Sequence, residues 1–136
     1  MKFLSPKIHG YLDFAVILVL FIGPSLFNFT NVASTLSYIL GAVYLVLVVF
    51  TAYPQGLFKV IPFTVHGAIE LVLSPLLIAM PWLARFSNDN SACYFYIALG
   101  VALFAVWLTT DYKAADIAYG KRGPDLGERP RGAATA

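Results

Sequence analysis

The sequence predicts an all-α integral membrane protein, a four-helix bundle made of two tandem helical hairpins. Three observations support this prediction. Apolar residues make up 60% of the 136 residues, charged residues make up only 12%, and long apolar runs occur four times along the chain. A soluble domain carries about a quarter charged residues, so lipid is the solvent that this composition fits. The composition argues against a disordered chain and a nucleic-acid-binding protein, and the lone Cys93 allows no internal disulfide.

Each apolar run is long enough to cross the hydrocarbon core of a bilayer, which takes about 20 residues. Because the runs are continuous rather than alternating, helices are favoured over strands. The short connections between the runs predict that neighbouring helices pack antiparallel. The predicted spans are Ile8–Phe29, Val32–Tyr53, Pro62–Phe86 and Ser91–Thr110.

The composition changes after the fourth span. Residues 112–119 are predicted to extend the fourth helix into water and to stop at Gly120. Residues 121–136 are polar and rich in Gly and Pro, which predicts a disordered cytoplasmic tail. The predicted transmembrane domain therefore covers residues 1–120.

An internal repeat relates the two predicted hairpins, about residues 6–56 and 62–119. A shift of 57 residues places His9 on His66, Gly10 on Gly67, Asp13 on Glu70 and Pro24 on Pro81. A shift of 59 residues then places Thr51 on Thr110 and Tyr53 on Tyr112. Apolar similarity between membrane helices is common, but matching His, Gly, acidic and Pro positions at one shift is not. Both copies are expected to insert with the same orientation, related by an axis along the membrane normal.

Each odd-numbered span ends in a short motif that contains proline. The motif reads Met80-Pro81-Trp82 in the second copy and Gly23-Pro24-Ser25 in the first. Both copies resemble the Ser-Pro-Trp motif of the SPW-repeat membrane proteins, although neither contains all three residues. In that family, the repeat is a pair of membrane helices, and the motif closes the first helix. The resemblance covers about residues 9–112 and implies a small bacterial inner-membrane protein, without implying an activity.

Positively charged residues predict the orientation of the spans. One side of the membrane collects eight Lys and Arg residues, whereas the other side has Arg85 alone. Because loops rich in Lys and Arg remain in the cytoplasm, both termini are expected on the cytoplasmic side of the inner (plasma) membrane. The lipid bilayer is the main expected partner. A homo-oligomer is also expected, since four helices enclose little volume and leave much packing surface.

Ionisable residues within the spans are the main candidates for function, because an unpaired charge in a bilayer is costly. His9 and Asp13 are four residues apart, as are His66 and Glu70. This spacing places each pair on one helix face, roughly 10 to 12 Å from the same end of its span. The sequence therefore predicts one polar cluster built from both hairpins. Its predicted members are His9, Asp13, His66, Glu70, Thr51, Tyr53, Thr110, Asp111 and Tyr112.

The sequence leaves the function of this cluster open. The main hypothesis is a proton or ion channel or transporter, because buried carboxylates and imidazoles can take up and pass on protons. The first alternative is a membrane protein that binds a transition metal through His9, Asp13, His66 and Glu70, or a haem through the two histidines as axial ligands. The second is a purely structural membrane partner, in which each His bonds its own carboxylate. An enzyme is less favoured, because the sequence has no phosphate-binding loop, nucleophile elbow or Cys-x-x-Cys motif.

Overall fold

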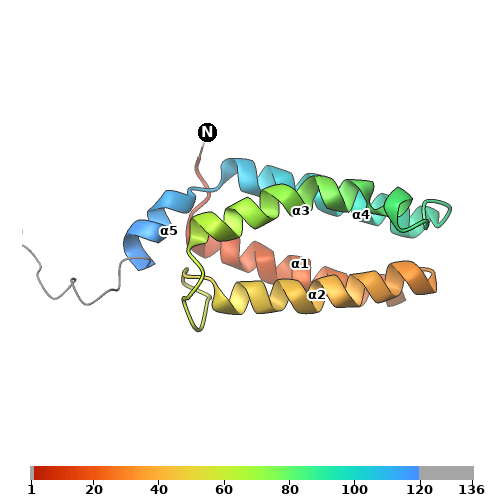
Figure 1. Ribbon diagram of the computed structural model, residues 1–136, viewed down its shortest axis with the longest axis horizontal. Coiled ribbons are helices and arrows are strands. Elements are labelled where there is room, and N and C mark those ends of the chain that lie inside the picture. Colours follow the sequence, from red (N-terminus) through yellow and green to blue (C-terminus); the bar gives the residue numbers. More distant parts are fainter. Residues whose placement is uncertain (1, 120–136) are drawn as a thin grey trace, which may run out of the picture.

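The computed structural model describes residues 2–119 and contains no strand within them. The helices are α1 (Pro6–Leu26), α2 (Asn31–Phe50), α3 (Phe63–Leu83), α4 (Asn90–Thr109) and the short α5 (Tyr112–Tyr119). The predicted all-α class and four-helix bundle are therefore confirmed (Figure 1). The predicted tail, residues 121–136, lies outside the described residues.

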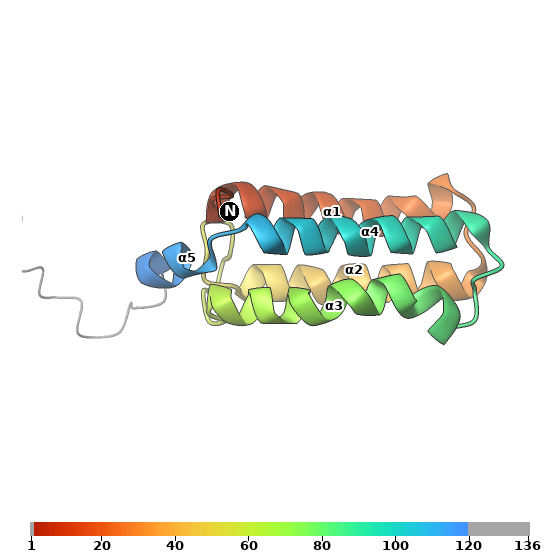
Figure 2. The same ribbon diagram turned by 90° about the horizontal axis from the view of Figure 1, so that it is seen from above.

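Successive long helices pair as antiparallel hairpins, α1 with α2 and α3 with α4 (Figure 1). Figure 2 places α1 and α4 along one side of the bundle and α2 and α3 along the other. Consequently α1 and α3 lie diagonally opposite each other, and their inner faces meet at the axis of the bundle. The end of the bundle that carries α5 and the start of the chain is called the basic end here, because Lys2, Lys7, Lys59 and Lys113 lie at it.

The four long helices meet the requirements for crossing a membrane. They are 20 or 21 residues long, and each is apolar enough to span a bilayer. Large apolar side chains remain exposed on their outward faces, for example Leu18, Val43, Val72 and Val101. Water-facing surfaces rarely carry apolar patches of this extent. The bundle is thus a membrane protein whose outward faces suit contact with acyl chains.

The motif at the end of α1 and α3 forms a turn that closes each helix. In α1, Asn28 adopts a left-handed backbone conformation with φ of 53°, and the N–H of Phe29 donates to the carbonyl oxygen of Pro24 at 3.0 Å. This is the hydrogen-bond pattern of a Schellman turn, which satisfies a carbonyl at the helix end. α3 ends in the same way at Arg85, with φ of 60°.

The prediction that residues 112–119 continue the fourth helix is wrong. Thr110 is extended, with φ of −84° and ψ of 139°, so α4 ends before it and α5 is a separate helix. The start of the chain stabilises this break. Leu4 pairs with Thr110 in a parallel bridge, and the N–H of Asp111 donates to the carbonyl oxygen of Leu4 at 3.2 Å.

The end of α2 has the same design. α2 stops at Phe50, before the predicted end at Tyr53, because Thr51 is extended and pairs with Ile61 in a parallel bridge. The N–H of Ala52 also donates to the carbonyl oxygen of Ile61 at 2.7 Å. Residues just beyond α2 and α4 therefore leave their helices and reach the inner faces of α1 and α3 at the basic end.

Polar contacts also join the hairpins away from the basic end. The Asp89 carboxylate accepts from the N–H of Thr30 at 2.6 Å and from the N–H of Ala92 at 3.1 Å. Burial alone would raise the pKa of Asp89, but these backbone N–H groups outweigh it and hold that pKa below its usual value. Deeper in the bundle, the hydroxyls of Ser37 and Tyr96 form a buried hydrogen bond of 2.9 Å.

Candidate metal centre

Four ionisable side chains from α1 and α3 converge on the axis of the bundle. His9 and Asp13 come from α1, and His66 and Glu70 come from α3. Each is at most 1% exposed, and one ligand atom from each residue lies within 4.8 Å of the others. The spacing of four residues within each helix turns both side chains of a pair to the inner face, as the sequence predicted.

The histidine Nε2 atoms face the carboxylates of both helices. His9 Nε2 lies 3.3 Å from Asp13 Oδ1 and 3.2 Å from Glu70 Oε1. His66 Nε2 lies 3.4 Å from Glu70 Oε1 and 3.6 Å from Asp13 Oδ2. Although these atoms are close, neither Nε2 makes a hydrogen bond among the described residues. Buried polar nitrogens without a partner are rare, so this pair requires an explanation.

The opposite ring nitrogens have partners that determine where the proton lies. His9 Nδ1 is 2.8 Å from Thr110 Oγ1, and His66 Nδ1 is 2.9 Å from Thr51 Oγ1. Each threonine hydroxyl gives its single proton to a carbonyl oxygen of the helix that precedes it, at 2.7 Å for Thr110 and 2.6 Å for Thr51. The threonine oxygens therefore accept from Nδ1–H. Each Nε2 then carries a lone pair when the ring is neutral, or a second N–H directed at the carboxylates when the ring is an imidazolium.

Three tyrosine hydroxyls hold the carboxylates in place. Tyr53 donates to Asp13 Oδ2 at 2.9 Å, and Tyr112 donates to Glu70 Oε2 at 2.5 Å. Burial, together with the adjacent carboxylate, raises the pKa of both hydroxyls, so both remain donors. The hydroxyl of Tyr44 lies 2.8 Å from Asp13 Oδ1 and 2.7 Å from Glu70 Oε1. Its one proton cannot serve both anions, so their mutual repulsion calls for a compensating positive charge.

An aromatic layer, made of Tyr53, Phe63 and Tyr112, separates the four side chains from the basic end. All three are buried, and the ring of Phe63 lies 5.2 Å from that of Tyr53 and 4.6 Å from that of Tyr112. Glycines allow the tyrosine rings to approach the helices. A Cβ atom on Gly67 would lie 2.6 Å from Tyr112 Cε1, and one on Gly10 would lie 2.7 Å from Tyr53 Cε2.

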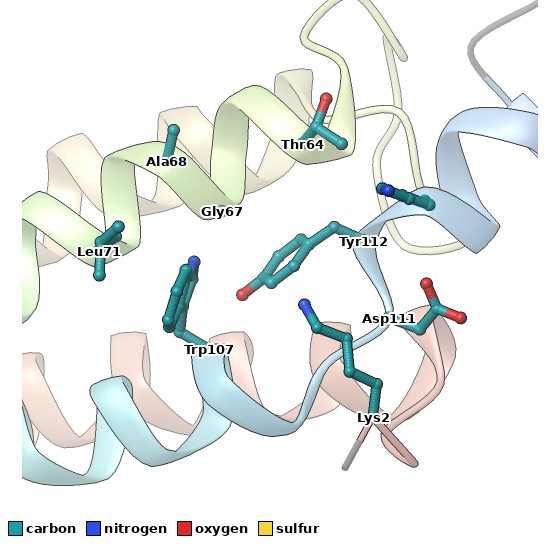
Figure 3. A pocket seen from close by; sticks show the side chains of 9 residues that line it. Lys2, Thr64, Gly67, Ala68, Leu71, Trp107, Asp111 and Tyr112 are labelled. Carbon is teal, nitrogen blue, oxygen red and sulfur yellow. The ribbon is translucent and has the colours of Figure 1, made fainter.

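The structure brings together all but one of the residues that the sequence placed in the cluster. Thr51, Thr110, Tyr53 and Tyr112 contact the four ionisable side chains directly. Asp111 instead accepts from the N–H of Ala114 at 3.3 Å, at the start of α5. Its carboxylate is directed away from the Tyr112 hydroxyl, at the edge of a cavity at the basic end (Figure 3).

Sequence reasoning missed Tyr44, which bridges the two carboxylates. The repeat drew attention to positions that match between the hairpins, and the position that corresponds to Tyr44 is Leu103. A hydroxyl in the middle of an apolar span was the signal that could have identified it. Tyr44 makes the cluster asymmetric, because the corresponding Leu103 is a buried apolar side chain without a hydroxyl.

Comparison with known proteins adds no relative: no family model, no curated protein and no solved structure matches the chain. The resemblance to SPW-repeat proteins therefore stays a prediction. The fold and the cluster still define a class of protein. It is a four-helix membrane protein with a buried His/Asp/Glu cluster whose four residues could hold a metal ion.

Proposed function

We propose that this protein binds a divalent first-row transition metal ion inside the membrane, with His9, Asp13, His66 and Glu70 as its ligands. The observation that carries the proposal is the convergence of two buried Nε2 atoms and two carboxylates, in which neither Nε2 has a hydrogen-bond partner among the described residues. A metal-binding histidine typically uses one ring nitrogen for the ion and donates from the other to a second group. Thr51 and Thr110 are suited to that second role.

The distances and charges fit a divalent cation. A tetrahedral ion with bonds of about 2.0–2.1 Å keeps neighbouring ligand atoms about 3.3 Å apart. The contacts between Nε2 and carboxylate oxygens span 3.2 to 3.6 Å, close to this spacing. All four ligand atoms lie within 4.8 Å of one another, so a bound ion would draw the most distant pair together. Two carboxylates also balance the charge of a divalent ion, which lowers the cost of burying all three charges in a medium of low dielectric constant. Imidazole and carboxylate ligands without thiolate favour zinc, iron or manganese over softer ions.

A metal ion fits the cluster better than a haem does. Axial ligation by His9 and His66 requires an open plane between the two rings for the porphyrin. The carboxylates of Asp13 and Glu70 and the hydroxyl of Tyr44 occupy the space next to both Nε2 atoms. The alternative of a haem-binding membrane protein is therefore the weaker one.

Ion transport remains the second candidate, and the bridging hydroxyl of Tyr44 is the observation that favours it. A hydroxyl within 2.8 Å of two carboxylates can pass a proton between them. A complete pathway also needs polar groups beyond the cluster. Beyond the cluster the buried side chains are mostly apolar, among them Ile17, Leu20 and Leu77. The buried hydroxyls of Ser74, Ser37 and Tyr96 already have partners within the bundle. These apolar side chains favour a protein that binds an ion over a protein that lets an ion cross the membrane.

Metal analysis of the purified chain tests the proposal. The protein is prepared without a polyhistidine tag, in lipid nanodiscs, and is dialysed against Zn²⁺. We expect one tightly bound Zn²⁺ per chain, lost in Glu70→Gln and in His66→Ala. Asp111→Asn is the matched control, because it removes an acid outside the cluster, and it should keep the ion. Wild-type protein that binds no more Zn²⁺ than Glu70→Gln would overturn the proposal. Proton flux in liposomes that is lost in Glu70→Gln would then support transport.

We also propose that the chain is a bacterial inner-membrane protein with both termini in the cytoplasm, forms homo-oligomers and belongs with the SPW-repeat proteins. The distribution of Lys and Arg supports the orientation. The turn shared by Pro24 and Pro81 supports the family. A green fluorescent protein fused after Ala136 should fluoresce, and alkaline phosphatase fused there should be inactive. The reverse pair of results would contradict the orientation.

A further inference from the structure

We infer that the metal ion reaches and leaves the cluster through the cavity between α3 and α5, and that the side chain of Tyr112 closes this route. This inference rests on the proposed metal site and adds how the ion is exchanged. It assigns different roles to the two tyrosines that correspond by the repeat, since Tyr53 holds Asp13 without facing this cavity.

The cavity is the first observation behind the inference. It has a volume of about 370 Å³ and lies at the basic end, where Gly67, Ala68, Trp107, Asp111 and Tyr112 form part of its lining. Figure 3 shows the ring of Tyr112 directed into the space between Gly67 and Trp107. The hydroxyl of the same ring donates to Glu70 Oε2. One side chain thus lies between this cavity and a ligand of the proposed ion.

A second cavity reaches the cluster but suits a charged ion poorly. It measures about 180 Å³, lies between α1 and α4, and is lined by Asp13 and otherwise by apolar side chains such as Val19, Leu99 and Val106. These helix faces lie in the membrane-spanning part of the bundle. A bare or hydrated cation would lose much of its solvation there. The cavity at the basic end is lined by polar and charged groups, and the carboxylate of Asp111 there can attract a cation despite the neighbouring Lys2 and Lys113.

The side of the cluster that carries Tyr53 is held more firmly. The loop after α2 is tied to the bundle, because Gln55 Nε2 donates to the carbonyl oxygen of Lys7 at 2.8 Å. Lys59 Nζ donates to the carbonyl oxygen of Tyr53 itself at 2.6 Å. The repeat places Tyr11 where the second hairpin has the small Ala68. The loop after α2 is therefore bonded in place beside Tyr53, whereas the cavity lies beside Tyr112.

The inferred route requires the ring of Tyr112, which packs against Phe63 and His9, to swing aside while the four long helices stay in place. Tyr112 begins α5, a helix of eight residues outside the bundle that follows the extended Thr110. Its ring packs over Gly67, which offers no Cβ to hold it. Rotation of the Tyr112 side chain would break its hydrogen bond to Glu70 Oε2 and leave that oxygen open to the cavity. Closing the ring again restores the donor and separates the ion from water.

The test compares two obstructions of similar size. Ala68→Trp fills the cavity at the basic end, and Ala15→Trp fills the apolar cavity between α1 and α4. Association of Co²⁺ with the full chain in nanodiscs, and its release to excess chelator, are followed by the absorption of bound Co²⁺. We expect Ala68→Trp to slow both rates by at least about tenfold, within the range over which association rates vary at one site. The Kd should be unchanged, and Ala15→Trp should behave as wild type.

A second pair of variants opens the route instead of blocking it. Tyr112→Ala should speed release of Co²⁺ more than Tyr53→Ala does, although each removes one hydroxyl from a carboxylate. Slower exchange in Ala15→Trp than in Ala68→Trp, or equal release from the two tyrosine variants, would overturn the inference and leave the metal site standing. Wild-type protein that binds no Co²⁺ would overturn the site and the route together.

Discussion

Replacing Thr110 by Val tests whether the threonines tune a metal site. The substitution keeps the volume of the side chain and removes one hydroxyl. That hydroxyl accepts from His9 Nδ1 at 2.8 Å and donates to the carbonyl oxygen of Val106 at 2.7 Å. Without it, the Nδ1–H of His9 is buried without an acceptor, and the ring no longer has a fixed proton position.

The size of the effect follows from these contacts. An unpaired buried donor costs about 1–3 kcal/mol of folding free energy. Loss of a hydrogen-bond partner behind a metal-binding histidine weakens metal affinity by about 10- to 100-fold. That loss corresponds to about 1.4–2.8 kcal/mol. Thr51→Val should act in the same way through His66, because its hydroxyl lies 2.9 Å from His66 Nδ1.

The assay is competition for Zn²⁺ between the tag-free protein in nanodiscs and a chelator of known affinity. Thr109→Val is the matched control. The substitution removes the threonine hydroxyl that precedes Thr110 in the sequence. That hydroxyl donates to the carbonyl oxygen of Ala105 at 2.9 Å, within α4. Equal Kd values for Thr110→Val, Thr109→Val and wild type would refute the role assigned to the threonine hydroxyls.

Three further predictions concern stability, each measured by unfolding in mixed micelles. Tyr44→Phe removes the donor shared by two buried carboxylates and should lower the stability of metal-free protein by about 1–3 kcal/mol. Added Zn²⁺ should reduce the stability difference between the variant and wild type. A stability difference that Zn²⁺ leaves unchanged would contradict charge compensation by the ion. Asp89→Ala removes a helix cap and should cost about 1 kcal/mol at neutral pH. Because the pKa of Asp89 is lowered in the folded protein, its contribution is present above the usual carboxylate pKa and disappears as the pH falls through the folded value; a difference that persists in acid would count against it. Ser37→Ala should cost about 0.5–1.5 kcal/mol through the lost bond to Tyr96, more than Ser34→Ala, whose hydroxyl bonds only a nearby carbonyl oxygen.

The sequence alone was sufficient for the helices and for the level of the cluster. Continuous apolar runs separate the spans, and the rise of a helix converts residue number into depth. His9 and His66 lie early in their spans, as do Asp13 and Glu70, so their meeting depended only on α1 and α3 sharing an orientation. The chain crosses the membrane twice between equivalent positions of α1 and α3. The two helices are therefore expected to run in the same direction.

The pairings within the cluster could not be predicted in this way. His9 belongs to the first hairpin and bonds Thr110 of the second, whereas His66 bonds Thr51 of the first. This pairing of each histidine with a threonine of the other hairpin depends on the path that the chain takes after α2 and after α4 at the basic end. The break before α5 depends on bonds from Leu4, which is far from Thr110 in the sequence. Neither pattern leaves a local signal in composition or periodicity.

X-ray absorption spectroscopy of the Zn²⁺-loaded chain in nanodiscs identifies the atoms that bind the ion. Binding by two histidines and two carboxylates predicts nitrogen and oxygen neighbours at about 2.0–2.1 Å from the ion, with the outer-shell scattering of two imidazole rings. The imidazole signal should fall by half in His9→Ala if that variant still holds an ion. A spectrum with a sulfur neighbour would place the ion at Cys93, and a shell of oxygen alone would mean that the ion avoids both histidines. Either spectrum would contradict the proposed site.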